Sequence, residues 1–526
     1  MVSLKQQATT GSEVNERLAA LISNTNAVRA TAAAVEGTLG PKGLDTMLVD
    51  RFGEVVITND GVTILSTMEA THPAAKMVIN VAKAQDEEVG DGTTTTTVMA
   101  GAMLGTGLEQ VLKGVPVARV IEGMRRGINF AIEALKQQSI PLSGLDDPRL
   151  KSVALVAGRG HEDIADLVVT AARLVGKEEL LKPNFKLAEI IVAQEGAANE
   201  VFKGVIISKE RMNRQMPERL TDVKVLVIDD ALEPEEIEDE ALGTEAGFNR
   251  YLALREEFKR NIEKIIDMGV KVVLVDRGVA EIAEEKLTDA GVMVIQRVIQ
   301  KELRRAAEHT GARMIKRTGL NKEPADLERY LGWAGEVYDD ERLEQVRIHA
   351  GGGKPMGTVV VGAATAEVVG ERERIAKDAA AAVQAAVKGG VVPGGGAVEL
   401  AVARETEKMR GRIRGMAAYG VDSVIEALKR PLAQIVANAG FNPLEKVGDV
   451  SAAQVARRKN SLAVDCDTGE IKDMLKAGVL DPTLVKIHAL KAAGETAEAI
   501  LRIDTIIRKR EEKQEGRDSG PDGGAG

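Results

Sequence analysis

The two ends of this 526-residue chain follow a helical pattern while its centre does not, and this contrast constrains the fold more than any other feature. Helical periodicity dominates up to about Pro141 and returns from Ala363. Between them, the short β-branched runs 223–230, 270–276 and 292–298 are separated by helical patterns, which is typical of an α/β unit. The pattern predicts an insertion architecture, in which both ends of the chain build one domain and other domains interrupt it.

Composition narrows the cellular setting and the partners. A chain of this length exceeds what one hydrophobic core usually holds, so two to four domains are expected. The net charge of −10 argues against nucleic acid or an anionic membrane as the main partner. We expect a cytoplasmic protein, because Met1–Gly11 lacks an apolar signal segment, no stretch is apolar enough to span a bilayer, and the one cysteine cannot form an internal disulfide. Aromatic residues make up 2%, so the core is predicted to be aliphatic.

A glycine-rich turn followed by five threonines is the strongest local motif. Gly90-Asp91-Gly92 precedes Thr93–Thr97 and then an apolar run. A helix that begins among these threonines directs unpaired N–H groups and a positive dipole end at the turn, and Asp91 offers an oxygen ligand suited to Mg²⁺. This combination favours a metal-bound polyphosphate. A helix N-terminus with low-complexity threonine explains the motif equally well when it is taken alone.

Three further segments support the phosphate interpretation. Leu39–Gly43 contains a glycine-proline turn, Asn59-Asp60-Gly61 follows a strand pattern, and Gly389–Gly396 is too rich in glycine for a helix interior. The chain contains neither a Walker A motif nor a G-x-G-x-x-G fingerprint, so neither a P-loop nor a Rossmann fold is supported.

Five motifs in one order resemble the signature set of the chaperonins: Thr38–Gly43, Ile57–Gly61, His72–Lys76, Gly90–Thr95 and Gly390–Gly396. The match covers nearly the whole chain. It is similar to the thermosome-like (group II) branch more than to the bacterial type that uses a separate lid protein. Arg159 stands where that branch has a lysine, and this and other departures suggest the divergent bacterial (group III) form.

The resemblance implies a multidomain α and α/β fold with three domains. A mostly helical equatorial domain, which binds ATP and forms the ring, comprises residues 1–141 and 396–526. A small intermediate hinge domain comprises 142–203 and 358–395. The α/β apical domain, which binds substrate, is 204–357.

The resemblance also implies a site for ATP and Mg²⁺. Donors for the β- and γ-phosphates are Gly92, Thr93, Thr94 and Thr95, and Asp91 is the Mg²⁺ ligand. Residues on the α-phosphate, ribose and base side are Leu39, Gly40, Pro41, Gly395 and Asp481.

Two carboxylates from different domains are expected to orient the attacking water. Asp378 interrupts an alanine-rich helical pattern although Asp is a poor interior helix former. A solvated helix face would explain it without the resemblance, which instead makes it catalytic, with Asp60 as its equatorial partner. Arg159 replaces the lysine that senses nucleotide, and arginine keeps the charge but not the point-like geometry.

A cluster of aromatic residues marks the apical region. Phe248, Tyr251 and Phe258 lie close together in the sequence, and on general grounds such a stripe packs on its own domain. The resemblance instead places a built-in lid here, near 237–258.

The function that the resemblance implies is an ATP-hydrolysing chaperone. Non-native polypeptides would be enclosed in a double ring of 16 or 18 subunits, with no separate lid co-chaperonin. A nucleotide-regulated holdase, supported only by Arg159, and a phosphotransferase with a small-molecule acceptor are the alternatives.

Overall fold

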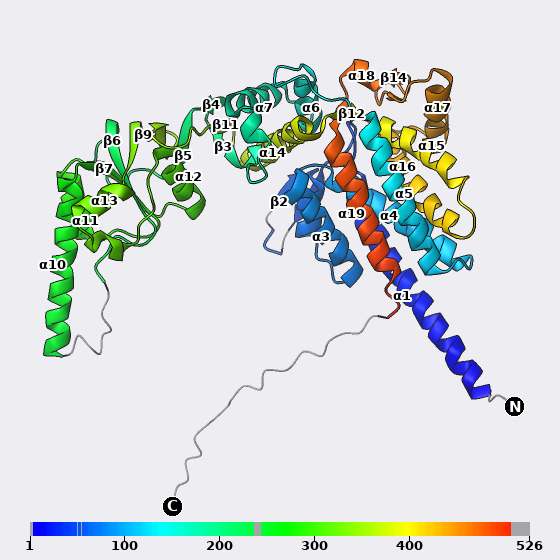
Figure 1. Cartoon of the computed structure of the whole chain (residues 1–526), viewed down its shortest axis with the longest axis horizontal. Helices are drawn as coiled ribbons and strands as arrows, with labels where there is room; N and C mark the ends of the chain where they lie inside the picture. Colours follow the sequence, from blue (N-terminus) through cyan, green and yellow to red (C-terminus); the bar gives the residue numbers. More distant parts are fainter. Residues whose placement is uncertain (1–3, 50, 54, 236–243, 506–526) are drawn as a thin grey trace, which may run out of the picture.

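The computed structural model describes residues 4–49, 51–53, 55–235 and 244–505. Figure 1 shows a helical region at one end of the molecule, a smaller mixed region in the middle and a sheet region at the other end. The names equatorial, intermediate and apical are used below for these three regions, in that order. None of the helices in the described ranges is long and apolar enough to cross a membrane.

Both ends of the described chain contribute helices to the equatorial region. Its first part contains α1 (Leu4–Glu36), β1 (Thr46–Val49), β2 (Val55–Thr58), α2 (Gly61–Thr67), α3 (Pro73–Val89), α4 (Thr93–Leu112) and α5 (Val117–Gln138). Its second part contains α15 (Ala397–Arg410), α16 (Ala417–Asn438), α17 (Pro443–Ala456), β13 (Leu462–Val464), β14 (Ile471–Asp473), α18 (Met474–Ala477), β15 (Leu480–Pro482) and α19 (Thr483–Leu501). Helix α4 packs against α1, α16 and α19.

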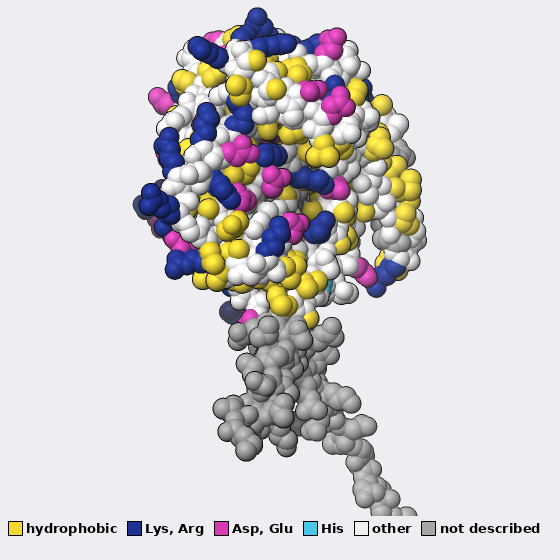
Figure 2. Space-filling view, turned by 90° about the vertical axis from the view of Figure 1, so that its right-hand side faces the viewer, with side chains coloured by type: hydrophobic (Ala, Val, Ile, Leu, Met, Phe, Trp, Pro, Cys, Tyr) yellow, Lys and Arg dark blue, Asp and Glu magenta, His cyan; other side chains and the backbone are white. Residues whose placement is uncertain are grey.

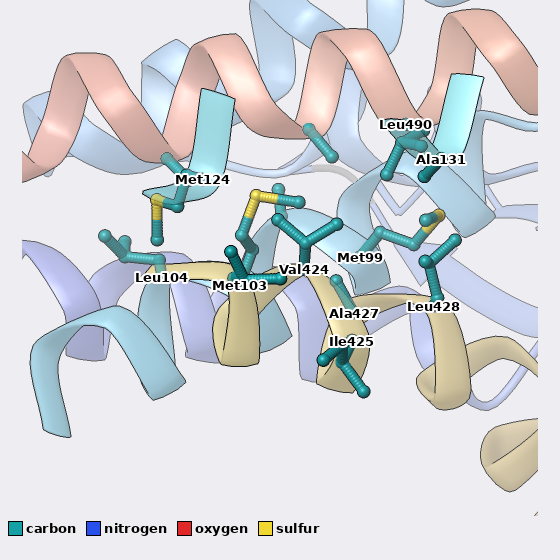
Figure 3. Packing of buried hydrophobic residues seen from close by; sticks show 14 of the residues in the cluster. Met99, Met103, Leu104, Met124, Ala131, Val424, Ile425, Ala427, Leu428 and Leu490 are labelled. Atoms are coloured by element: carbon teal, nitrogen blue, oxygen red, sulfur yellow. The ribbon is translucent and has the colours of Figure 1, made fainter. Parts of the chain in front are cut away.

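The core of this region is aliphatic, as the composition predicts. Figure 3 shows Met99, Met103 and Met124 interleaved with Leu428 and Leu490, and all five side chains are buried. Each contributes about 1.5–3 kcal/mol of hydrophobic free energy on burial. Methionine adapts its shape to irregular gaps, which suits helices that come from distant parts of the chain.

The outer face of the equatorial region carries charges of both signs. In Figure 2 lysine and arginine side chains alternate with acidic and apolar ones over this end of the molecule. The hairpin β1–β2 is more apolar, because Met47 and Val49 are each 62% exposed. Exposed apolar residues on a two-stranded hairpin leave surface for another chain to cover.

The intermediate region joins the two ends of the molecule. Its first part holds α6 (Arg149–Ala157), α7 (Glu162–Val175), α8 (Lys177–Leu180), η1 (Leu187–Ile190), β3 (Ile191–Glu195) and β4 (Glu200–Phe202). After the apical region come β11 (Thr358–Ala363), α14 (Ala366–Gly389) and β12 (Val391–Pro393). Strand β11 lies between β3 and β4, parallel to the first and antiparallel to the second.

The apical region is built on a six-stranded sheet of order β5-β10-β9-β6-β7-β8. Its strands are β5 (Gly204–Ile207), β6 (Arg219–Ile228), β7 (Val270–Val275), β8 (Met293–Ile295), β9 (Gly332–Asp340) and β10 (Gln345–Gly351). Its helices are α10 (Glu245–Asp267), α11 (Glu281–Asp289), α12 (Gln300–Thr310), η2 (Arg317–Asn321), α13 (Pro324–Leu327) and η3 (Glu328–Tyr330). The predicted β-branched runs are the parallel strands β6, β7 and β8, so the α/β prediction is confirmed.

The predicted lid, 237–258, is only partly covered by the structure. Residues 237–243 lie outside the described ranges, and the remainder forms the first half of α10, along the outer edge of the apical region in Figure 1. Phe248 is 53% exposed, whereas Phe258 is 6% exposed and packs in the apical core. The aromatic stripe is therefore divided between surface and core, and the lid assignment stays a prediction.

Candidate functional site

The glycine-threonine motif forms the N-terminus of helix α4. Gly92 is the N-cap residue with φ +80°, and its N–H donates to Asp91 Oδ1 at 2.6 Å. A Cβ at this position would lie 2.7 Å from Val485 Cγ1, so glycine is required both for the backbone conformation and for the contact with α19. The turn presents a helix N-terminus, which is suited to an anionic group.

The five threonines divide into two groups. The hydroxyls of Thr96 and Thr97 each donate to the carbonyl four residues earlier, at 2.9 Å. In the described part of the chain, the hydroxyls of Thr93, Thr94 and Thr95 have no hydrogen-bond partner. Thr93 and Thr94 are nevertheless almost buried. Unpaired hydroxyls at a helix N-terminus can donate to an anionic ligand, so these residues fit a ligand that accepts their hydrogen bonds.

The second motif, Asn59-Asp60-Gly61, lies directly against these threonines. A Cβ on Gly61 would be 2.4 Å from Thr94 Oγ1 and 3.0 Å from Thr93 Oγ1. Asp60 caps helix α2, accepting hydrogen bonds from the N–H groups of the second and third helical residues at 3.3 and 3.0 Å. Part of the reason for an aspartate here is therefore local, since an N-cap aspartate stabilises a helix by about 1 kcal/mol.

Five carboxylates gather at this point: Asp86 on α3, Asp378 on α14, Asp481 on β15, and Asp60 and Asp91 in the turns before α2 and α4. Burial raises the pKa of Asp91 to about 6, with Asp481 adding to the shift. Burial also raises the pKa of Asp378 well above its usual range, and the charges of Asp60 and Asp91 raise it further. The pKa of Asp86 is raised by burial and then by Asp60. Carboxylates that disfavour each other's ionisation form a site that a cation would stabilise.

The donor set fits a magnesium ion that is held mainly by a phosphate ligand. No group of three or more His, Cys, Asp or Glu side chains within the described ranges is arranged to hold a metal ion. Mg²⁺ commonly uses one or two carboxylates and completes its shell with phosphate oxygens and water. Asp91, beside the threonine hydroxyls, is the residue that would hold it.

Arg159 lies on the loop after α6 and faces the acidic cluster from the intermediate region. It has a positive φ of 54° and forms an ion pair with Glu371 on α14. Its Nη2 is also 3.8 Å from Asp378 Oδ2. The structure therefore places this predicted sensor residue next to the predicted water-orienting carboxylate.

The nucleoside-side residues occupy two separate places. Leu39 O accepts a hydrogen bond from Asn438 Nδ2 at 2.8 Å, and a Cβ on Gly40 would lie 3.1 Å from Ile435, so the loop of Leu39, Gly40 and Pro41 is held against α16. On the other side, β12 pairs with β15 so that Val392 faces Asp481.

The glycine loop after β12, Gly394–Gly396, lies beside β15 because the two strands are paired. A Cβ on Gly394 would lie 3.0–3.1 Å from the Asp481 carboxyl group, whereas one on Gly395 would approach Met474 Sδ at 3.4 Å. Absence of a side chain at Gly394 therefore keeps the Asp481 carboxyl group accessible.

Sequence reasoning missed several residues of the site. Asp86 lies one helical turn before Gly90, and Glu371 lies two turns before Asp378 on the same helix. Helical spacing could have identified both. No local sequence pattern identifies Asn438, which is hydrogen-bonded to Leu39 although the two are 399 residues apart in the sequence.

Cavity size does not by itself identify the proposed site. A cavity of about 680 Å³ lies between the end of α19 and helices α1, α4 and α5, and it contains none of the predicted site residues.

Comparisons with known proteins agree with the fold and with these motifs. Residues 31–511 match the TCP-1/cpn60 chaperonin family. The chain is 36% identical to thermosome subunit beta of Archaeoglobus fulgidus, covering 95% of this chain and 94% of that protein. It is 34% identical to the thermosome subunit of Methanocaldococcus jannaschii, over 95% of this chain and 94% of that one.

The structural comparison points the same way. A crystal structure of a group III chaperonin in the open state superposes with a TM-score of 0.86 and 48% identity, covering 94% of this chain and 100% of that one. The predicted three-domain fold is confirmed, and the chain belongs to the TCP-1/cpn60 chaperonin family.

Proposed function

We propose that this chaperonin hydrolyses Mg·ATP at the site between α4 and α14, and that hydrolysis drives lid closure over a non-native polypeptide. One observation carries the proposal: Asp378 of the intermediate region lies close enough to Asp60 and Asp91 of the equatorial region for their charges to raise its pKa, and unpartnered threonine hydroxyls lie beside these two residues at the start of α4. A site divided between two regions is complete only when they are close together.

The residues of the site divide the work of hydrolysis. The hydroxyls and N–H groups of Thr93–Thr95 donate to phosphate oxygens, and Arg159 offers a charge on the γ-phosphate side. When bound, Mg²⁺ neutralises phosphate charge and is held by Asp91. Asp378 and Asp60 accept hydrogen bonds from the attacking water and orient it. Burial, and then the charges of Asp60 and Asp91, raise the pKa of Asp378, which makes it a stronger base than an exposed aspartate.

The coupling to folding rests on the arrangement of the domains. Helix α14 carries Asp378 and lies in the intermediate region next to β3 and β11, between the nucleotide and the apical sheet. Movement of α14 toward α4 would therefore be transmitted to the apical region. Apolar apical surface would bind clients in the open state without sequence preference, because the hydrophobic effect is not directional.

Assembly into a ring is part of the proposal. The exposed apolar hairpin β1–β2 fits a contact between subunits, and closure would need no separate lid protein. Sixteen subunits of 56.0 kDa correspond to about 900 kDa and eighteen to about 1,000 kDa. Light scattering with and without Mg·ATP measures this mass, and a stable monomer in both conditions would exclude the chamber.

The decisive experiment separates binding from turnover. Asp378→Ala should abolish ATP hydrolysis and the refolding of an unfolded client while leaving ATP binding nearly intact. Glu373→Ala is the matched control, because Glu373 lies on the same helix and pairs with Lys377 at the surface. Turnover that survives in Asp378→Ala would refute the water-orienting role.

A further inference from the structure

A buried ion cluster lies next to the nucleoside side of the proposed site. Lys486 Nζ is 2.7 Å from Glu399 Oε1 and 2.7 Å from Asp481 Oδ2. The three residues come from α19, α15 and β15. The side chains of Lys486 and Glu399 are 12% and 2% exposed.

The presence of this buried ion cluster is not explained by its contribution to folding stability. Removing charges from water costs several kcal/mol per ion, and apolar residues of similar size often replace a buried ion pair without loss of stability. Burial lowers the pKa of the Lys486 ammonium, but the attraction of Asp481 and Glu399 outweighs it and raises the pKa, so Lys486 stays charged. In the described ranges, neither carboxylate oxygen of Glu399 has a hydrogen-bond partner, so the ion pair with Lys486 is what balances the Glu399 charge.

The contact engages only one oxygen of Asp481. Lys486 binds Oδ2, and no described group binds Oδ1. The same carboxyl group lies where Gly394 leaves room for a ligand, within range to raise the pKa of Asp91. Oδ1 of Asp481 is thus free for a ligand beside the Gly90–Gly92 turn, while Lys486 holds Oδ2 in place.

We propose that Lys486, anchored by Glu399, is a positioning residue that orients the Asp481 carboxylate toward the ribose hydroxyls and so sets the preference for ribonucleotides. This inference rests on the proposed nucleotide site and deepens it. A hydrogen bond to a charged acceptor is made only by a sugar that carries the hydroxyl, so the expected preference is roughly tenfold in affinity.

The test compares equilibrium binding of Mg·ADP, 2′-deoxy-ADP and 3′-deoxy-ADP by titration calorimetry. The wild type is expected to bind ADP roughly tenfold more tightly than at least one deoxy analogue. The double variant Lys486→Met with Glu399→Leu removes both anchoring charges together, so that Glu399 is not left as an unpaired buried carboxylate while Asp481 loses its ion-pair partner. It should lose this ratio and match Asp481→Asn, because Asp481 is no longer held in place.

Two further variants keep the experiment decisive. Arg410→Met with Asp422→Leu removes an ion pair at the far end of α15 and should leave the ratio unchanged. Glu399→Gln preserves shape and frees Lys486 to engage both Asp481 oxygens, so the ratio should fall even if the double variant does not fold.

The outcomes separate the inference from the proposed function. Equal weakening of all three ligands in the double variant, with the ratio retained, would overturn the positioning role and leave ATP binding standing. A wild type that binds ADP without preferring it would overturn the Asp481 assignment together with the inference. A wild type that binds no nucleotide would refute the proposed function itself.

Discussion

The proposed nucleotide site lies where the equatorial and intermediate regions meet, whereas the first half of α10 lies along the outer edge of the apical region, and the two depend on different physics. At the site, the charges of Asp60 and Asp91 raise the pKa of Asp378, and a Cβ added to Gly61 or Gly92 would come within 3 Å of a neighbouring side chain. Along α10, by contrast, Phe248 near the N-terminal end is exposed to solvent, and the buried side chains begin at Leu254. Binding and hydrolysis of a nucleotide require particular residue types at particular positions, whereas an apolar contact surface can be formed by many different sequences.

The largest expected effect lies at the site, where the charge of Asp60 can be separated from its role as a helix cap. Asp60→Asn should lower turnover roughly 100-fold or more, because it removes a water-orienting carboxylate. Thermal stability should stay the same, since asparagine caps a helix as well as aspartate does.

Asp60→Ala is the comparison variant, and it should lose about 1 kcal/mol of stability as well as turnover. Steady-state ATPase assays and thermal melts measure both quantities. Unchanged turnover in Asp60→Asn would show that Asp60 only caps α2 and does not orient the attacking water together with Asp378.

The second prediction divides the aromatic stripe of α10. Phe258→Ala should destabilise the apical region by about 3–5 kcal/mol, because it leaves a cavity in the core. Phe248→Ala should leave stability unchanged within about 0.5 kcal/mol but impair closure of the lid. Urea unfolding and protease protection with Mg·ATP distinguish the two variants, and normal protection in Phe248→Ala would argue against a lid role for this surface.

The third prediction concerns pH and affects only the nucleotide site. The pKa of Asp91, near 6 in the folded state, exceeds its unfolded value, so the folded chain binds the proton more tightly and is destabilised above that pH. Between pH 7 and pH 5, without Mg²⁺ or nucleotide, the wild type should gain about 1 kcal/mol relative to Asp91→Asn. Parallel unfolding free energies for the two proteins across this range would show that Asp91 is not strained by its surroundings.

The smallest effect on folding is expected at the hairpin β1–β2. Replacing both Met47 and Val49 by serine should change subunit stability by less than about 0.5 kcal/mol, because both side chains are exposed. The native mass should fall if the hairpin forms a subunit contact. Ile299→Ser, an exposed apolar position in the apical region, is the control, and an intact ring in the hairpin variant would place the contact elsewhere.

The sequence predicted best what local geometry dictates. Gly92 needs a positive φ at a helix start, and β6, β7 and β8 carry a β-branched pattern, so both could be identified along the chain. Partners far apart in sequence could not, as the ion pairs of Arg159 with Glu371 and of Lys486 with Glu399 illustrate. The resemblance supplied the role of Asp378, whose sequence context alone allowed a solvated helix face.

The pairing of β12 with β15 also has a consequence for how the protein is made. Val392 meets Asp481, and α19 closes over α4, so the last quarter of the chain completes a site whose phosphate-binding turn is synthesised in the first quarter. During translation the apolar face of α4 that packs against α19 therefore stays uncovered until α19 has been synthesised. A chain that ends before β15 lacks both Asp481 and α19, so we expect that prematurely terminated chains do not form the proposed nucleotide site.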